Sequence, residues 1–210
     1  MNDLPNWTMI PFGDRAALVR FEETITPTVN DQVTALHDAI RSSNNTAIEY
    51  MVPAFCSLTI GFDSRRIDYQ TLHKQVQQCA ASALSRRPSN VATIEIPVCY
   101  DECFGVDLAQ AAIDTQLSID EIIALHTQPD YRVYMLGFLP GFAYLGSVPK
   151  NIQLARHATP RLKVPQGAVG IAGGQTGVYP VEAPGGWRII GRTPTSMLGN
   201  DRTSFLLKPG

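Results

Sequence analysis

The residues of this chain that are best suited to binding an anion lie in one stretch, from Met135 to Pro194. These 60 residues hold six of the 17 lysines and arginines but only one of the 19 acidic residues, which gives a local charge of +5 in a chain of net charge −2. The stretch also holds 11 of the 16 glycines and seven of the 15 prolines. Positive charge among tight turns indicates a surface that binds an anionic ligand. The alternative is that these side chains are solvated loop charges.

Two arginines of this stretch are the expected anion-binding groups. Arg161 and Arg192 can each hold a carboxylate or a phosphate by two parallel hydrogen bonds. The alternative role of both is to brace turns by bonding backbone carbonyls. Glycine-rich turns in the same stretch can bring bare backbone N–H groups close to a ligand, because glycine has no Cβ. The residues expected to bind the ligand are Gly141, Phe142, Tyr144, Arg161, Gly174, Gln175, Thr176, Tyr179, Gly185, Gly186, Trp187, Arg192 and Thr193.

The stretch offers few groups that could act as a base. Glu182 is its only carboxylate and His157 its only imidazole, and a histidine beside arginines is more often a surface residue than a general base. Gln175, Thr176 and Tyr179 could orient an amide or a carbonyl. We therefore expect a surface that binds and polarises a ligand. The catalytic residues stay unassigned, and the base or nucleophile would come from elsewhere, most simply from another subunit.

Composition and missing motifs exclude several classes of function. There is no phosphate-binding loop, no dinucleotide fingerprint and no nucleophile elbow. The weak net charge gives no general attraction to nucleic acid or to an anionic membrane, and no apolar run approaches the roughly 18 residues of a membrane span. The N-terminus shows no secretory signal, so we expect a cytoplasmic protein. The cysteines form no convincing metal site, and we expect free thiols at Cys56, Cys79, Cys99 and Cys103.

The first 90 residues alternate strand and helix patterns. We expect strands at 17–21, 47–52, 55–62 and 93–98, with helices that begin after Thr26 and after Asp68. This β-α-β-β-α-β order predicts a ferredoxin-like unit. The polar link at residues 86–90 marks the expected boundary, so we predict an α/β domain at 1–88 and a second domain at 89–210 that carries the motif-rich surface.

The second domain begins with helical patterns and continues with strands. Asp107 can cap one short helix, and Ser118 with Glu121 forms a capping box for the next. That second helix carries acids and no lysine or arginine, which argues against DNA binding. From Tyr131 onward, short apolar runs separated by glycine and proline predict a compact β-barrel or sandwich.

Three motifs in the glycine-rich stretch resemble one known family. They are GFLPGFAYLG at 137–146, ATPRLKVPQGAVGIAGGQTGVYP at 158–180 and APGGWRIIGRTP at 183–194. In this order they resemble allophanate hydrolase subunit 1, the family that contains the B subunit of 5-oxoprolinase and a sporulation-kinase inhibitor. Segments near Phe12, Pro53 and Pro97 extend the resemblance over nearly the whole chain.

The resemblance implies a fold and a function. The fold would be a ferredoxin-like α/β domain followed by a cyclophilin-like β-barrel. The chain would be the B subunit of an ATP-dependent 5-oxoprolinase. It would act with a partner of the allophanate hydrolase subunit 2 type (the C subunit of 5-oxoprolinase) and with the A subunit of 5-oxoprolinase. ATP would serve the complex, and no metal is expected.

Two other functions stay open on the resemblance. One is inhibition of a sensor histidine kinase, and the other is half of a biotin-dependent urea carboxyltransferase, although no biotin attachment segment is visible here. The sequence departs from the family at Ala183, where members usually have serine. It also stops at Gly210, where members usually continue into one more apolar strand.

Overall fold

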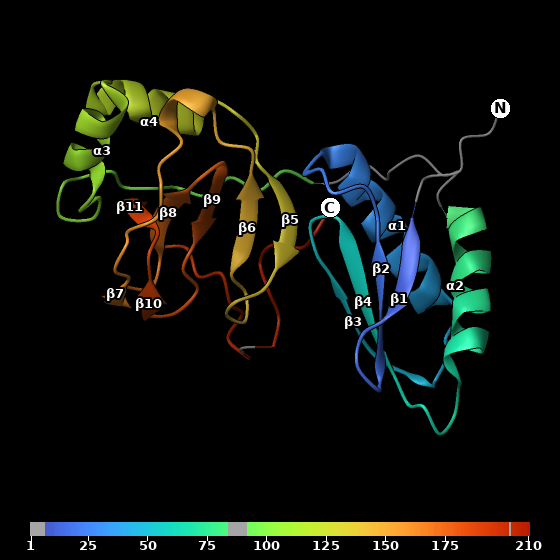
Figure 1. Cartoon of the computed structure of the whole chain (residues 1–210). Coiled ribbons are helices and arrows are strands. Elements are labelled where there is room, and N and C mark those ends of the chain that lie inside the picture. Colours follow the sequence, from blue (N-terminus) through green and yellow to red (C-terminus); the bar gives the residue numbers. More distant parts are fainter. Residues whose placement is uncertain (1–6, 84–91, 202) are drawn as a thin grey trace. The chain divides into compact units, whose positions relative to one another are not determined.

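The computed structural model describes residues 7–83, 92–201 and 203–210. Contacts between Cα atoms divide the chain into two compact units, Met1–Val91 with Gly210 and Ala92–Pro209. The expected boundary at residues 86–90 lies outside the described residues. Each unit combines helices with antiparallel sheets (Figure 1), so the chain has a mixed α/β fold.

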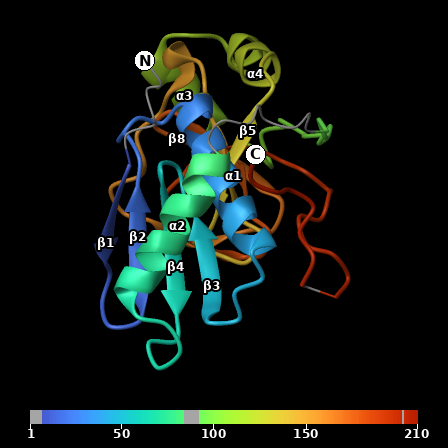
Figure 2. The same cartoon turned by 90° about the vertical axis from the view of Figure 1, so that its right-hand side faces the viewer.

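The first unit is a four-stranded antiparallel sheet with two helices on one face (Figures 1 and 2). The strand order is β1-β2-β4-β3. Its elements are β1 (Thr8–Pro11), β2 (Ala16–Arg20), α1 (Pro27–Ser42), β3 (Ile48–Pro53), β4 (Ser57–Phe62) and α2 (Tyr69–Ala83).

Local signals explain where the two helices begin. The Thr26 hydroxyl accepts a hydrogen bond from the Val29 N–H at 3.3 Å, and Pro27 occupies the first turn of α1. The Asp68 carboxylate accepts from the Thr71 N–H at 2.8 Å ahead of α2. Both expected helix starts are therefore confirmed, and apolar side chains at helical spacing pack each helix onto the sheet.

The expected last strand of this unit is wrong. Residues 93–98 form no strand; their alternating apolar side chains, Ile96 and Val98, pack instead against the core of the second unit. The place beside β2 is taken by β1, which sequence reasoning missed because only Met9 of its four residues is buried. A strand with so little buried surface leaves no readable period in the sequence.

The second unit opens with two short helices and continues with strands. Its sheets are a five-stranded one, in the order β11-β8-β9-β6-β5, and a two-stranded one, β10-β7. The elements are α3 (Leu108–Thr115), α4 (Ile119–Thr127), β5 (Arg132–Leu136), β6 (Ala143–Gly146), the 3₁₀ turn η1 (Lys150–Ile152), β7 (Arg161–Val164), β8 (Ala168–Ala172), β9 (Gln175–Val178), β10 (Ala183–Gly185) and β11 (Arg188–Arg192).

The described residues of this unit do not close a barrel. β11 and β5 are the two edges of the five-stranded sheet, and β7 pairs only with β10. Prolines at 165, 180 and 184 flank or interrupt these strands and keep them to a few residues. Where the sequence predicted a compact β-barrel or a sandwich, these residues form two antiparallel sheets without a closed barrel.

Two apolar clusters hold the second unit together. One joins α3 and α4 to the five-stranded sheet, and it includes Ile122, Ile171 and Ile190. The other is aromatic, with the rings of Tyr179 and Trp187 each packed edge-on against Phe142, at centroid distances of 5.3 Å. The capping box of Ser118 and Glu121 is confirmed and fixes the start of α4 beneath the first cluster.

A fragment that begins near Asn90 is expected to keep much of its β structure, because both clusters of the second unit are formed by its own residues. Far-ultraviolet circular dichroism of this fragment, beside the full chain, measures it. A spectrum of a fully unfolded fragment would contradict the division into two units.

Candidate functional site

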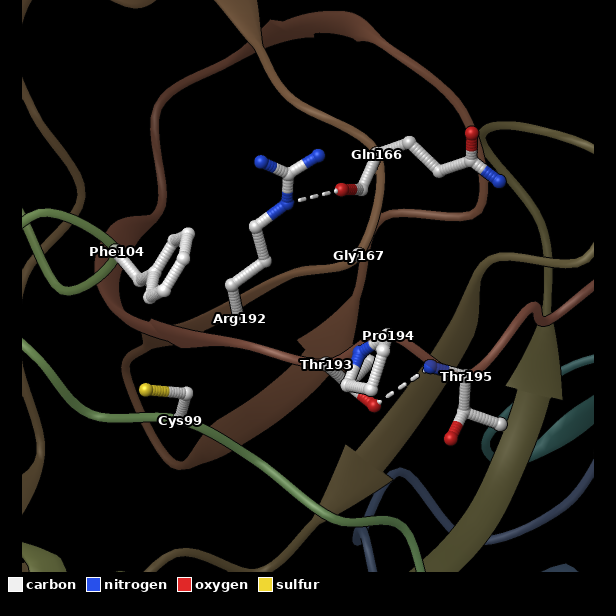
Figure 3. A pocket seen from close by; sticks show the side chains of 8 residues that line it. All are labelled: Cys99, Phe104, Gln166, Gly167, Arg192, Thr193, Pro194 and Thr195. Atoms are coloured by element: carbon white, nitrogen blue, oxygen red, sulfur yellow. Dashed lines mark hydrogen bonds between the residues drawn. The ribbon is translucent and has the colours of Figure 1, made fainter.

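A pocket of about 560 Å³ lies in the second unit, around the end of β11 (Figure 3). Three segments that are far apart in the sequence form it: the loop before α3, the turn before β8 and the end of β11. The lining residues are Cys99, Phe104, Gln166, Gly167, Arg192, Thr193, Pro194 and Thr195.

Backbone hydrogen bonds bring these segments together. Cys99 and Arg192 exchange two of them, with N···O distances of 2.8 and 2.9 Å. On the other side, the Thr193 N–H donates to the Gly167 carbonyl at 2.8 Å. Gly167 has φ of +80°, and a Cβ there would overlap the Thr193 carbonyl oxygen. Glycine is therefore required where this turn meets β11.

Arg192 is held in a fixed orientation at the pocket. Its Nε donates to the Gln166 carbonyl at 2.8 Å, and its guanidinium carbon lies 6.0 Å from the centroid of the Phe104 ring. Figure 3 shows the guanidinium beside that ring, with the Gln166 side-chain amide pointing away from it. With Nε bound, the two terminal nitrogens are the donors that Arg192 can offer a ligand. The side chain thus both braces a turn and carries the positive charge of the pocket.

Arg161, the other expected anion-binding arginine, is bound within the protein. Both of its terminal nitrogens donate to the Asp107 carboxylate, at 2.9 and 2.6 Å. The same carboxylate accepts the Ile189 N–H at 2.7 Å and lies 3.1 Å from His157 Nε2. Asp107 is only 4% exposed. Burial opposes its charge, but the hydrogen bonds from Arg161 and Ile189 outweigh it and hold the pKa of Asp107 below its ordinary value.

The sequence correctly predicts that Asp107 precedes α3, but the predicted capping by its side chain is wrong. It is the N-cap residue of α3, yet its side chain makes no capping hydrogen bond. It reaches instead to partners 50, 54 and 82 positions later in the chain. A capping pattern is local and readable, whereas nothing in the sequence indicates a contact over such separations.

Most of the aromatic residues expected to bind a ligand are in the core. Phe142, Tyr179 and Trp187 are each at most 3% exposed, while Tyr144 is partly exposed at the edge of the same cluster. A Cβ at Gly185 would overlap the Tyr179 hydroxyl. These residues therefore contribute to the packing of the aromatic cluster and do not line the pocket.

The expected glycines lie at close approaches of the backbone to other groups. Gly185 pairs with Arg161 across β10 and β7, and the Gly186 carbonyl accepts the His157 N–H at 2.8 Å. Gly141, with φ of +80°, packs against Leu198 and Phe205, and Gly174 packs against the Gln153 amide. Gln175 begins β9. Of the thirteen expected residues, the structure places Arg192 and Thr193 in the pocket.

Thr176 belongs to a hydrogen-bond network that also includes His126 and Tyr100. Its hydroxyl donates to the Gly170 carbonyl at 3.0 Å and lies 2.9 Å from His126 Nε2. Since that hydroxyl proton is used, Nε2–H must donate to Thr176, and Nδ1 accepts from the Tyr100 hydroxyl at 2.8 Å. Both ring nitrogens of His126 therefore have a hydrogen-bond partner when the imidazole is neutral. Burial lowers the pKa of His126 to about 4.

Within the described ranges, no group of three or more His, Cys, Asp or Glu side chains could hold a metal ion. No helix in that part of the chain is long and apolar enough to cross a membrane.

Comparison with known sequences decides the family. Residues 7–207 match the family model described as carboxyltransferase domain, subdomain C and D. The chain belongs to this carboxyltransferase-domain family. The pocket, the Asp107 cluster and the aromatic core all lie within the matched residues.

Individual relatives add detail to the family assignment. The chain is 40% identical over 195 residues to the B subunit of 5-oxoprolinase from Bacillus subtilis, covering 88% of this chain and 81% of that protein. It is 50% identical over 118 residues to the B subunit of 5-oxoprolinase from Escherichia coli O157:H7, covering 56% of this chain and 54% of that one.

One solved structure is also similar. The crystal structure of TTHA0988 superposes with a TM-score of 0.81 at 37% identity, over 93% of this chain. The chain spans only 38% of that protein. The part of that protein that resembles this chain is therefore less than half of its length.

Replacement of Asp107 is expected to destabilise this carboxyltransferase-type domain. In Asp107→Asn the buried partner of Arg161 loses its charge, which should cost about 3 kcal/mol of unfolding free energy, measured by urea denaturation. The matched control is Asp114→Asn, whose carboxylate is partly exposed and 3.4 Å from Arg188; it should cost no more than about 1 kcal/mol. Equal losses in the two variants would contradict a special role for Asp107.

The buried His126 predicts a loss of stability in mild acid. Its pKa is about 4 in the folded protein and about 6.5 when exposed. Between these values the unfolded chain binds a proton that the folded protein does not, so this residue lowers stability as pH falls from 6.5 to 4, by roughly 3 kcal/mol in total. Urea denaturation at several pH values measures it. His126→Asn should flatten the slope over this range, and an unchanged slope would count against the assignment.

Proposed function

We propose that this chain is the B subunit of a multi-subunit, ATP-dependent 5-oxoprolinase, which opens the ring amide of 5-oxoproline to give glutamate. The observation that carries the proposal is the 40% identity to the Bacillus subtilis B subunit over 88% of the chain. The partners would be a C subunit of the allophanate hydrolase subunit 2 type and the A subunit of 5-oxoprolinase. ATP would be consumed by the complex.

The chemistry of the pocket fits a protein that binds the substrate but does not complete the reaction. Its lining offers a guanidinium, hydroxyls and a thiol, and neither a carboxylate nor an imidazole. The buried carboxylate of Asp107 accepts two hydrogen bonds from Arg161 and does not line the pocket. A general base that removes a proton from water needs an accessible position beside the substrate. That group would therefore come from a partner subunit.

Each of the two units would have the fold that the family resemblance implies. The first unit would be the ferredoxin-like domain, at 1–88, because strands β2, β4 and β3 lie in the order of a split β-α-β unit. The second, at 89–210, would be a variant of the cyclophilin-like barrel. With its free thiols at Cys56, Cys79, Cys99 and Cys103, the protein would work in the cytoplasm.

Of the two other functions, only the biotin-dependent carboxyltransferase has a supporting observation, the description of the matched family. Inhibition of a histidine kinase has no specific support from the described residues.

Reconstitution tests the proposed function. The purified chain with 5-oxoproline and ATP should release little or no glutamate, because its pocket lacks a base. Addition of the A and C subunits from the same genome should give rapid glutamate release with ATP hydrolysis, and omission of this chain should abolish it. Full turnover by the chain alone, or by the A and C subunits without it, would overturn the proposal.

A further inference from the structure

We propose that the pocket at the end of β11 is a carboxylate-binding subsite. It takes a small monoanionic acid that carries a ring amide, with Arg192 on the carboxylate and the ring against Phe104. This inference rests on the proposed function and deepens it, since it assigns the acid group of 5-oxoproline to a particular side chain.

Charge is the first argument for a monoanion. The lining contains one guanidinium and no acidic side chain, so it carries a charge of +1. The loop just before Phe104 carries Asp101 and Glu102. A nucleotide polyphosphate, with several negative charges, would meet one cation and nearby carboxylates. A single carboxylate matches the one positive charge of the pocket.

The fixed orientation of Arg192 is the second argument. Its Nε is held by the Gln166 carbonyl, so the plane of the guanidinium is set before any ligand arrives. Less side-chain entropy is then lost on binding. The two terminal nitrogens form a planar fork that matches the two oxygens of a carboxylate. Arg161, by contrast, already holds a carboxylate within the protein, that of Asp107.

The remaining lining groups suit a ring amide. Phe104 is 37% exposed and offers an apolar face beside the guanidinium. The Thr193 hydroxyl oxygen accepts the Thr195 N–H at 3.1 Å, so its proton can be donated to a ligand carbonyl. At about 560 Å³ the pocket is larger than a single-ring acid fills. The excess volume leaves room for reacting groups from a partner subunit.

Binding to the full chain tests the inference. Isothermal titration with L-5-oxoproline is compared with 2-pyrrolidinone, which has the same ring amide and no carboxylate, and with ATP. We expect 5-oxoproline to bind at least about tenfold more tightly than 2-pyrrolidinone, because the charge-assisted pair is lost without the carboxylate. Arg192→Gln should weaken 5-oxoproline binding about 10- to 100-fold, and Arg192→Lys should restore part of it.

The matched control is Arg188→Gln on the same strand. Arg188 donates to the Ala155 carbonyl and pairs with Asp114, outside the pocket, so 5-oxoproline binding should be unchanged. Melting temperatures check that all three variants are folded.

The subsite would be overturned by equal binding of 2-pyrrolidinone, by unchanged binding to folded Arg192→Gln, or by ATP binding that Arg192→Gln abolishes. Absence of 5-oxoproline binding both to the chain and to the assembled complex would also overturn it. An active complex whose activity does not depend on Arg192 would overturn the subsite alone. An inactive wild-type complex would instead count against the proposed function.

Discussion

The carboxylate of Asp107 is the constraint on which the second unit depends. It is almost fully buried, and it stays charged because Arg161 and the Ile189 N–H bind it from two different strands. A buried charge that lost these partners would cost several kcal/mol. The start of α3 is therefore held to β7 and to β11 together. The alignment of β11 in turn sets where its last residue, Arg192, meets the pocket.

The same interaction changes how the local charge of the glycine-rich stretch should be counted. Its excess of basic residues is real, but acids from outside the stretch neutralise part of it. Asp107 takes Arg161 and Asp114 takes Arg188, while Lys163 faces Glu182 within the stretch. The positive charge offered to a pocket ligand is then that of one oriented guanidinium. A local count of charges overestimates what a ligand meets whenever the fold brings acids from elsewhere.

Sequence reasoning succeeds where the physics is local. Thr26 and Ser118 act within one helical turn, so the starts of α1 and α4 could be predicted. It fails where a segment chooses between partners far away. Residues 93–98 alternate like a strand, yet they pair in no sheet: Ile96 and Val98 pack partly buried against the core of the second unit, and Ile94 is exposed. Of the residues predicted to bind the ligand, Arg192 and Thr193 line the pocket, but the pairing of Arg161 with Asp107 carries no local signal.

The motifs that identify the family describe the scaffold more than the ligand. Their aromatic residues and several of their glycines serve close packing, as the approach of Gly185 to the Tyr179 hydroxyl illustrates. The pocket forms where the end of one motif, at Arg192 and Thr193, meets Cys99 and Phe104, which lie outside all three motifs. Two chains with identical motifs could therefore present different pockets. In this chain the third motif supplies the guanidinium of Arg192, and the loop before α3 supplies Cys99 and Phe104, so the pocket depends on residues that the motifs do not include.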